Sequence, residues 1–342
     1  MKRSVLLIVG AAAMLALGQR TSSPSAPPSA PPPVPRGLVP IIWPPDNPYT
    51  PAKAELGRLL YFDPRLSADG TVSCASCHDP RYAFTDGQPV SSGVRGQKGG
   101  RSAPTVINRA WSLAQFWDGR APTLEEQAKG PMANPIEMAN THDNVATTVK
   151  AIPGYRARFR TVFGTEDITI DHVAKAIATF ERTVVSGDSP YDRHKAGQTS
   201  ALNAAQKRGM SVFLDKAKCD QCHEGINFTN GSFNNLGVGL DKPNPDEGLS
   251  AVTKRAEDWG KFKTPTLREV ALTAPYMHDG SLATLLDVVE FYDRGGTPNK
   301  NKDERMKMLH LSAQEKADLV EFLKALSGTG WQHIQPPKEF PQ

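Results

Sequence analysis

Two copies of one short motif constrain this 342-residue chain more than any other feature. The motif reads C-A-S-C-H at residues 74–78 and C-D-Q-C-H at residues 219–223, and together the two copies contain all four cysteines. C-x-x-C-H is the attachment signature of c-type haem: the thiols add to the vinyl groups and the histidine binds the iron. The sequence therefore predicts two covalently bound haem c groups. Their attachment residues would be Cys74, Cys77 and His78 for the first, and Cys219, Cys222 and His223 for the second.

Other uses of paired cysteines fit less well. A structural zinc site could use two C-x-x-C pairs, but these lie 145 residues apart and each carries an additional histidine. A thioredoxin-like redox pair would occur once, in a βαβ context that the sequence lacks. Four cysteines in a chain of this length also exclude a disulfide-dense small fold.

The N-terminus has the pattern of a secretory signal peptide. Lys2 and Arg3 precede an apolar run over residues 5–17, and small residues stand at Ala16 and Gly18. A run of this length is too short to span a bilayer comfortably, although an uncleaved membrane anchor is the alternative. We therefore expect residues 1–18 to be a signal peptide, with export to the periplasm and no membrane attachment after cleavage.

The charge of the chain gives little information about its partners. Removing residues 1–18 removes two basic and no acidic residues, which leaves 38 basic against 36 acidic residues and lowers the formal net charge from +4 to +2. A balance this close to neutral does not indicate a nucleic-acid-binding protein.

Proline-rich sequence follows the signal peptide, and we expect residues 19–46 to be an extended linker. The remainder predicts a mainly α fold. Helices are expected at 52–62, 124–129 (capped by Thr123 with Glu126), 170–184, 200–214, 285–294 (capped by Thr284 with Asp287) and 313–326 (capped by Ser312 with Glu315). The spacing of the motifs predicts two cytochrome c-like haem domains with long loops, over residues 47–198 and 199–335.

Several further segments resemble the bacterial di-haem cytochrome c peroxidase and MauG family. They are R-S-A-P-T-V-I-N at 101–108, A-Q-F-W-D-G-R at 114–120, E-Q-A-K-G-P at 126–131 and A-P-Y-M-H-D-G at 274–280. Their order and spacing match the family pattern over nearly all of residues 47–330. The resemblance implies that the haem of His78 is the peroxide site and that the haem of His223 transfers electrons.

The resemblance also implies roles for three further residues. Glu137 matches a carboxylate that moves a proton during cleavage of the peroxide bond, as a general acid and base. Gln127 matches a glutamine that orients the peroxide or a water molecule. Trp117 matches a tryptophan between the two haems, where its oxidisable ring would shorten the path of an electron. Without the resemblance, each would be read as an ordinary loop, surface or core residue.

Two departures from the peroxidase pattern make the chain more similar to MauG. Typical members have a loop histidine that blocks the peroxide site until the other haem is reduced, and the corresponding residue here is Val94. Typical members also bind the second iron through a methionine, and the corresponding residue here is Tyr292, as in MauG. The resemblance therefore implies an open first haem and a tyrosinate ligand on the second. The alternative is that Tyr292 is a core residue and that Met277 or water binds the iron.

The family further implies a calcium ion between the haems, held partly by backbone carbonyls. Thr273 and Pro275 match two of its positions, and Ser102 replaces the usual asparagine at the third. Calcium accepts such oxygen ligands and tolerates water among them.

The implied function is a di-haem oxidoreductase that uses hydrogen peroxide. It would form a high-valent haem state and oxidise a remote donor or a partner protein. MauG oxidises its partner through a surface tryptophan, whose position here is Ala217, and Trp259 and Trp331 are the substitutes that the sequence offers. One alternative is a peroxide-detoxifying peroxidase that takes electrons from a small cytochrome. Another is a non-catalytic di-haem electron carrier.

Overall fold

The computed structural model describes residues 30–342, which are mainly helical as predicted. The helices are α1 (Pro51–Phe62), α2 (Cys74–Cys77), α3 (Leu124–Ala133), α4 (His142–Ala151), α5 (Pro153–Phe163), α6 (Ile170–Thr183), α7 (Pro190–Lys195), α8 (Ala204–Ser211), α9 (Ser250–Thr253), α10 (Leu285–Asp293) and α11 (Ala313–Lys324). Within these residues, no helix is long and apolar enough to cross a membrane. The expected signal peptide (1–18) and the first part of the expected linker (19–29) lie outside the described residues.

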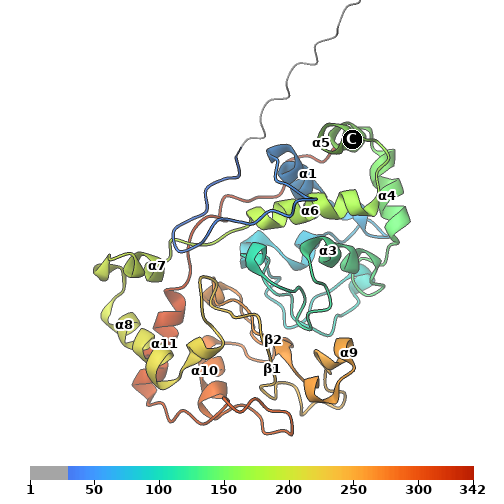
Figure 1. The fold of residues 1–342 in the computed structure, drawn as a ribbon. Coiled ribbons are helices and arrows are strands. Elements are labelled where there is room, and N and C mark those ends of the chain that lie inside the picture. Colours follow the sequence, from blue (N-terminus) through green and yellow to red (C-terminus); the bar gives the residue numbers. More distant parts are fainter. Residues whose placement is uncertain (1–29) are drawn as a thin grey trace, which may run out of the picture.

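The helices form two groups, each around its own cluster of buried apolar side chains (Figure 1). The N-terminal group contains α1 and α3 to α6, and the C-terminal group contains α8, α10 and α11. Each group includes one of the two C-x-x-C-H motifs.

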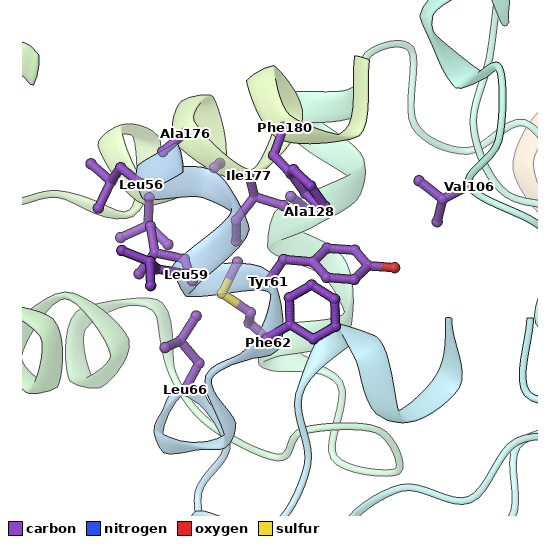
Figure 2. Close-up of a cluster of buried hydrophobic side chains, with 14 of the residues drawn as sticks. Leu56, Leu59, Tyr61, Phe62, Leu66, Val106, Ala128, Ala176, Ile177 and Phe180 are labelled. Carbon is purple, nitrogen blue, oxygen red and sulfur yellow. The ribbon is translucent and has the colours of Figure 1, made fainter. Parts of the chain in front are cut away.

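The N-terminal group is organised by the crossing of α1 and α6. Gly57 lies at the crossing, where an added Cβ would stand 1.9 Å from the carbonyl oxygen of Ala176, so the helices approach only because the side chain is missing. Tyr61 and Phe180 pack edge to face beside it, with ring centroids 5.1 Å apart. Figure 2 shows the two helices contributing neighbouring side chains to one cluster of buried apolar residues.

The C-terminal group repeats this crossing between α8 and α11. Gly209 takes the place of Gly57, and its added Cβ would stand 1.9 Å from the carbonyl oxygen of Asp318. Phe213, on a π-helical turn that continues α8, packs against Phe322 with ring centroids 5.2 Å apart. The two groups are therefore built on the same helix crossing.

Helix ends follow their capping residues. Thr284 and Ser312 form the predicted capping boxes of α10 and α11, and the Thr123 hydroxyl accepts the Glu126 N–H at the start of α3. The predicted helix at 200–214 is divided, because Asn203 caps α8 and a separate 3-10 turn covers residues 199–201. Helices α4, α5 and α7 were not predicted.

A short antiparallel ribbon joins the groups. It consists of β1 (Phe233–Asn234) and β2 (Phe262–Lys263), with Phe233 opposite Lys263. The backbone N–H of Lys263 also donates to the carbonyl oxygen of Trp117, at 2.8 Å. Trp117 belongs to the loop before α3, so this bond connects the ribbon to the N-terminal group.

The start of the described chain lies at the junction of the two groups, and its C-terminal segment lies on the N-terminal group. The Asp188 N–H, after α6, donates to the carbonyl oxygen of Arg36, at 2.7 Å. The segment after α11 returns to the N-terminal group, where Trp331 packs edge to face on Phe84 and the carbonyl oxygen of Gln342 accepts the N–H of Gly154. Figure 1 accordingly shows the C-terminus beside α5.

A buried ion pair holds the start of the C-terminal group. Arg268 is 1% exposed, and its guanidinium donates to both carboxylate oxygens of Asp192 on α7, at 2.5 and 2.9 Å. The same guanidinium donates to the carbonyl oxygen of Ile226 and lies over the ring of Phe228. The pair therefore fixes the loop that follows the second motif.

The substitution Asp192→Asn is expected to lower the free energy of unfolding by about 3–5 kcal/mol, because it leaves the Arg268 charge buried without a counter-ion. The matched control is Asp188→Asn. Asp188 is 38% exposed and forms ion pairs at 3.7 Å, so its loss should cost less than about 1 kcal/mol. Urea unfolding of the holoprotein measures both, and equal effects would contradict the structural role of the buried pair.

Candidate active site

The first motif forms the single helical turn α2, which begins after Ser73 and ends before His78. Ser73 and Ser76 form a reciprocal capping box across this turn, and the His78 N–H donates to the Cys74 carbonyl oxygen at 3.0 Å. The Tyr61 hydroxyl of α1 donates to the carbonyl oxygen of His78 at 2.8 Å. Helix α1 therefore positions the motif, whose two thiols are free and partly buried.

The two motif histidines have matching environments. The Nδ1 of His78 lies 3.3 Å from the carbonyl oxygen of Phe84, and the Nδ1 of His223 lies 3.0 Å from that of Phe228. Both phenylalanines have left-handed backbone angles, with φ of 60° and 49°. Burial lowers the pKa of both imidazoles, that of His223 to about 4, so both are neutral near pH 7. A neutral imidazole that donates through Nδ1 has Nε2 free to bind iron.

A cavity of about 760 Å³ surrounds the second motif. Cys219, Cys222 and His223 all line it, and its volume lies within the range of roughly 300–1,000 Å³ that is usual for cofactor-sized ligands. Two thiols, a neutral imidazole and a largely apolar cavity fit a covalently attached haem. The first motif offers the same set of donor atoms, so the residues present fit two haem c groups.

The loops after the two motifs repeat one another with a constant spacing of 161 residues. Each repeat has a threonine hydroxyl that bonds to the loop after the motif, a residue in the left-handed conformation, an isolated antiparallel bridge, and a threonine that caps the following helix. After the first motif these are Thr105, Asn108, the bridge Gln115–Ala121 and Thr123. After the second motif they are Thr266, Glu269, the bridge Tyr276–Leu282 and Thr284.

In this repeat, Tyr292 of α10 and Pro131 of α3 occupy equivalent positions, 161 residues apart. Tyr292 lines the cavity, and no described residue hydrogen-bonds to its hydroxyl, whose pKa is raised by burial. Pro131 has no side-chain atom that could bind a metal. Met277 lines the same cavity, so Tyr292 and its alternative Met277 both stay predictions as ligands of the second iron.

Trp117 is held by both groups. Its indole N–H donates to the carbonyl oxygen of Ser102 at 2.9 Å, and its own carbonyl accepts the N–H of Lys263. Its side chain contributes to the wall of the cavity around the second motif. Trp117 thus lies where the N-terminal group meets the C-terminal cavity.

Glu137 lies near the first motif. Burial raises the pKa of its carboxyl above the usual value, and the positive charge of Arg120 partly offsets this effect. Burial raises the pKa of Cys77 to about 11, and the negative charge of Glu137 adds to the increase. Gln127, on α3, is half-buried, and no hydrogen bond joins it to Glu137 among the described residues.

The loop at the Val94 position packs against Glu137. Val94 is 1% exposed, and its N–H donates to the carbonyl oxygen of Glu137 at 2.8 Å. A Cβ added at Gly93 would stand 1.9 Å from the carbonyl oxygen of Ile136, so the two segments are in close contact. An apolar side chain therefore occupies the core at this position.

The residues matched to the calcium site share one wall. Ser102, Thr273 and Pro275 all line the cavity around the second motif. The carbonyl oxygen of Ser102 already accepts the Trp117 indole N–H. Residues 30–342 contain no cluster of three or more histidine, cysteine or acidic side chains suited to a metal.

The tryptophans offered as substitutes for a surface donor differ in exposure. Trp259 is half-buried, whereas Trp331 is only 7% exposed and is packed on Phe84. Ala217 contributes to the lining of the cavity. The structure also brings Arg109 and Lys263 to this cavity, and no motif or periodicity in the sequence indicated either.

Comparisons with known proteins agree with this geometry. Residues 51–200 match the family model of the di-haem cytochrome c peroxidases. The MauG protein of Methylorubrum extorquens is 43% identical over 286 residues, covering 83% of this chain and 80% of the relative. The cytochrome c551 peroxidase of Nitrosomonas europaea is 44% identical over 278 residues, covering 80% of each chain.

A solved structure supports the same relationship. The crystal structure of a MauG-like protein associated with microbial copper homeostasis aligns with a TM-score of 0.82 at 35% identity, covering 90% of this chain and 99% of that one. Fold, donor atoms and relatives therefore agree that this chain belongs to the di-haem cytochrome c peroxidase and MauG family and is an enzyme with peroxidase activity that uses two haems.

Proposed function

We propose that this protein is a periplasmic, MauG-type di-haem enzyme in which hydrogen peroxide reacts at the haem of His78. The observation that carries the proposal is the asymmetry of the internal repeat. Where α10 has Tyr292 facing the cavity of the second motif, α3 has Pro131, which has no atom that binds iron. Val94 also brings no ligand to the first motif. The second haem would therefore have a side chain available as a further iron ligand, and the first would be left accessible to peroxide.

Glu137 and Gln127 would serve the open site. Haem, when bound, supplies the iron and the electrons for splitting the peroxide bond. Reduction of peroxide to two water molecules needs two protons and two electrons, and one proton must pass between the peroxide oxygens. Glu137 would carry this proton, because burial raises the pKa of its carboxyl and makes the carboxylate a stronger base than an ordinary glutamate. Gln127 would orient the peroxide through its amide.

Trp117 would connect the two haems, since it lines the second cavity while belonging to the N-terminal group. The electrons would come from a remote donor or a partner protein. The second candidate is a peroxidase that takes them from a small cytochrome, and the 44% identity to a cytochrome c551 peroxidase favours it. Pro131 argues against a third candidate, an electron carrier with two six-coordinate haems.

Two structural expectations belong to the same proposal. Residues 47–198 and 199–335 would each be one haem domain. The two buried clusters support this division, except that Trp331 and Ile334 pack in the N-terminal cluster and Tyr191 packs against the C-terminal one. A calcium ion would lie near Ser102, Thr273 and Pro275, supported by their common position on the cavity wall.

The fully oxidised holoprotein is expected to react with hydrogen peroxide without prior reduction. Its electron paramagnetic resonance spectrum should show one high-spin and one low-spin ferric haem. Stopped-flow spectra should then show a long-lived oxidised product and slow oxidation of an added reduced cytochrome c. Fast cytochrome turnover would favour the detoxifying peroxidase, and two low-spin signals would contradict the open site.

The variant Tyr292→Phe is expected to alter the low-spin signal and raise the reduction potential of the second haem, because it removes an anionic ligand that stabilises the ferric state. The matched variant Met277→Leu, on the same cavity wall, should leave both unchanged. The reverse pattern would assign Met277 as the ligand.

The variant Glu137→Gln is expected to slow the reaction with peroxide by roughly 10²–10⁴-fold, as expected for loss of a general acid–base. Glu126→Gln, on the exposed face of α3, is the control. Since the ionised carboxylate takes the first proton and its pKa is raised, the wild-type rate should fall on acidification at a higher pH than for an ordinary glutamate. A pH profile that Glu137→Gln leaves unchanged would remove Glu137 from this role.

A further inference from the structure

Two cationic side chains face the cavity of the second motif without an acidic partner. Lys263 on β2 is 5% exposed, and its ammonium donates only to the carbonyl oxygen of Ala114 and the hydroxyl of Ser112. Arg109 is half-buried, and its Nε donates to the carbonyl oxygen of Thr105 at 2.8 Å. Neither forms an ion pair within residues 30–342.

This arrangement contrasts with that of the buried arginines Arg182 and Arg268, whereas buried Lys53, away from this cavity, also donates only to neutral oxygens, on Asn47 and Pro48. Arg182 donates to both oxygens of Glu125, and Arg268 to both oxygens of Asp192. Buried charges in proteins are normally paired in this way, because an uncompensated charge is expensive to remove from water. Arg109 and Lys263 lack the anion that this rule requires.

The acidic groups around them do not fill this role. Glu181 acts on Arg109 from beyond ion-pair distance, and burial raises its own pKa to about 8, so it is mostly protonated at neutral pH. Asp118 acts on Lys263 but is already bound by Arg101 and Arg120.

The two cations also oppose each other. Burial, followed by repulsion from Arg109, lowers the pKa of Lys263 to about 6, and burial lowers that of Arg109 to about 10. Lys263 therefore needs a negative charge near it to stay charged at neutral pH, whereas Arg109 stays charged and lacks a counter-ion.

Their position indicates where this negative charge comes from. Arg109 and Lys263 line both the cavity around the second motif and a smaller one of about 180 Å³ beside it, at the junction of the two groups. A haem attached through its vinyl groups to Cys219 and Cys222 carries two propionates on the opposite edge of its ring. In the bound haem, those carboxylates would face the lining of the same cavity.

We propose that Arg109 and Lys263 together bind the propionate carboxylates of the haem attached to Cys219 and Cys222. The proposal rests on the assignment of two haems and does not depend on the reaction with peroxide. It gives the two residues a positioning role. Arg109 from the N-terminal group and Lys263 from the ribbon would together hold the haem at the junction, beside Trp117. Their positive charge also favours an additional electron on that haem.

The test is the reduction potential of each haem, measured by spectroelectrochemistry on the holoproteins without peroxide. Lys263→Met and Arg109→Gln should each lower the potential of the second haem, because each removes a positive charge near its propionates. Lys263→Arg, which keeps the charge, should restore the wild-type value. The matched control is Lys261→Met next to β2: Lys261 pairs with Asp258, which keeps Arg255 as a partner.

Each other outcome has a definite meaning. Unchanged potentials in both Lys263→Met and Arg109→Gln would overturn the proposal. If phosphate or chloride shifts the wild-type potential and the shift is lost in Lys263→Met, a diffusible anion occupies the site instead, and the propionate assignment is wrong. If Lys263→Met loses the second haem, full haem content in Lys263→Arg supports the proposal, and loss in both overturns it. Failure of peroxide reactivity alone would affect only the proposed function.

Discussion

The close crossing of two helices at a glycine is the constraint on which the rest of each unit depends. Because Gly57 lets α1 approach the backbone of α6, Tyr61 reaches the carbonyl of His78 and fixes the first motif. Gly209 allows the equivalent approach of α8 to α11 in the second unit. A side chain at either glycine would separate the helices and move the motif away from the loop that orients its histidine.

Two units with the same backbone arrangement could support different haem chemistry. The surroundings of the motif histidine are alike in both units, whereas the side chains offered to the other side of the haem differ. The bonds from His78 and His223 to backbone carbonyls are alike, so both irons would be held by a neutral imidazole. The differences lie at matched positions on the following helix, Pro131 and Tyr292. In the proposed function, the different roles of the two haems would thus come from single side chains on a common backbone.

The sequence could predict what depends on local pattern. The motifs, the capping residues Thr284 and Ser312 and the helical periodicity of α6 are local, and the structure agrees with them. Helix α7 was missed because it is short and polar, and tertiary contacts stabilise it. Glu137, Gln127 and Trp117 came from the family resemblance, since nothing local marks them. Arg109 and Lys263 were missed because what marks them is the lack of an acidic partner. That lack can be recognised only in the folded structure, where distant segments come together.

The return of the last segment to the N-terminal group has a consequence for biosynthesis. Trp331 and Ile334 complete the apolar cluster built by α1 and α6, and Gln342 bonds to Gly154 at the start of α5. A chain emerging from the ribosome cannot complete the apolar cluster of its first unit until Trp331 and Ile334 have followed. The first unit in the sequence is therefore completed only after the whole of the second unit has been synthesised.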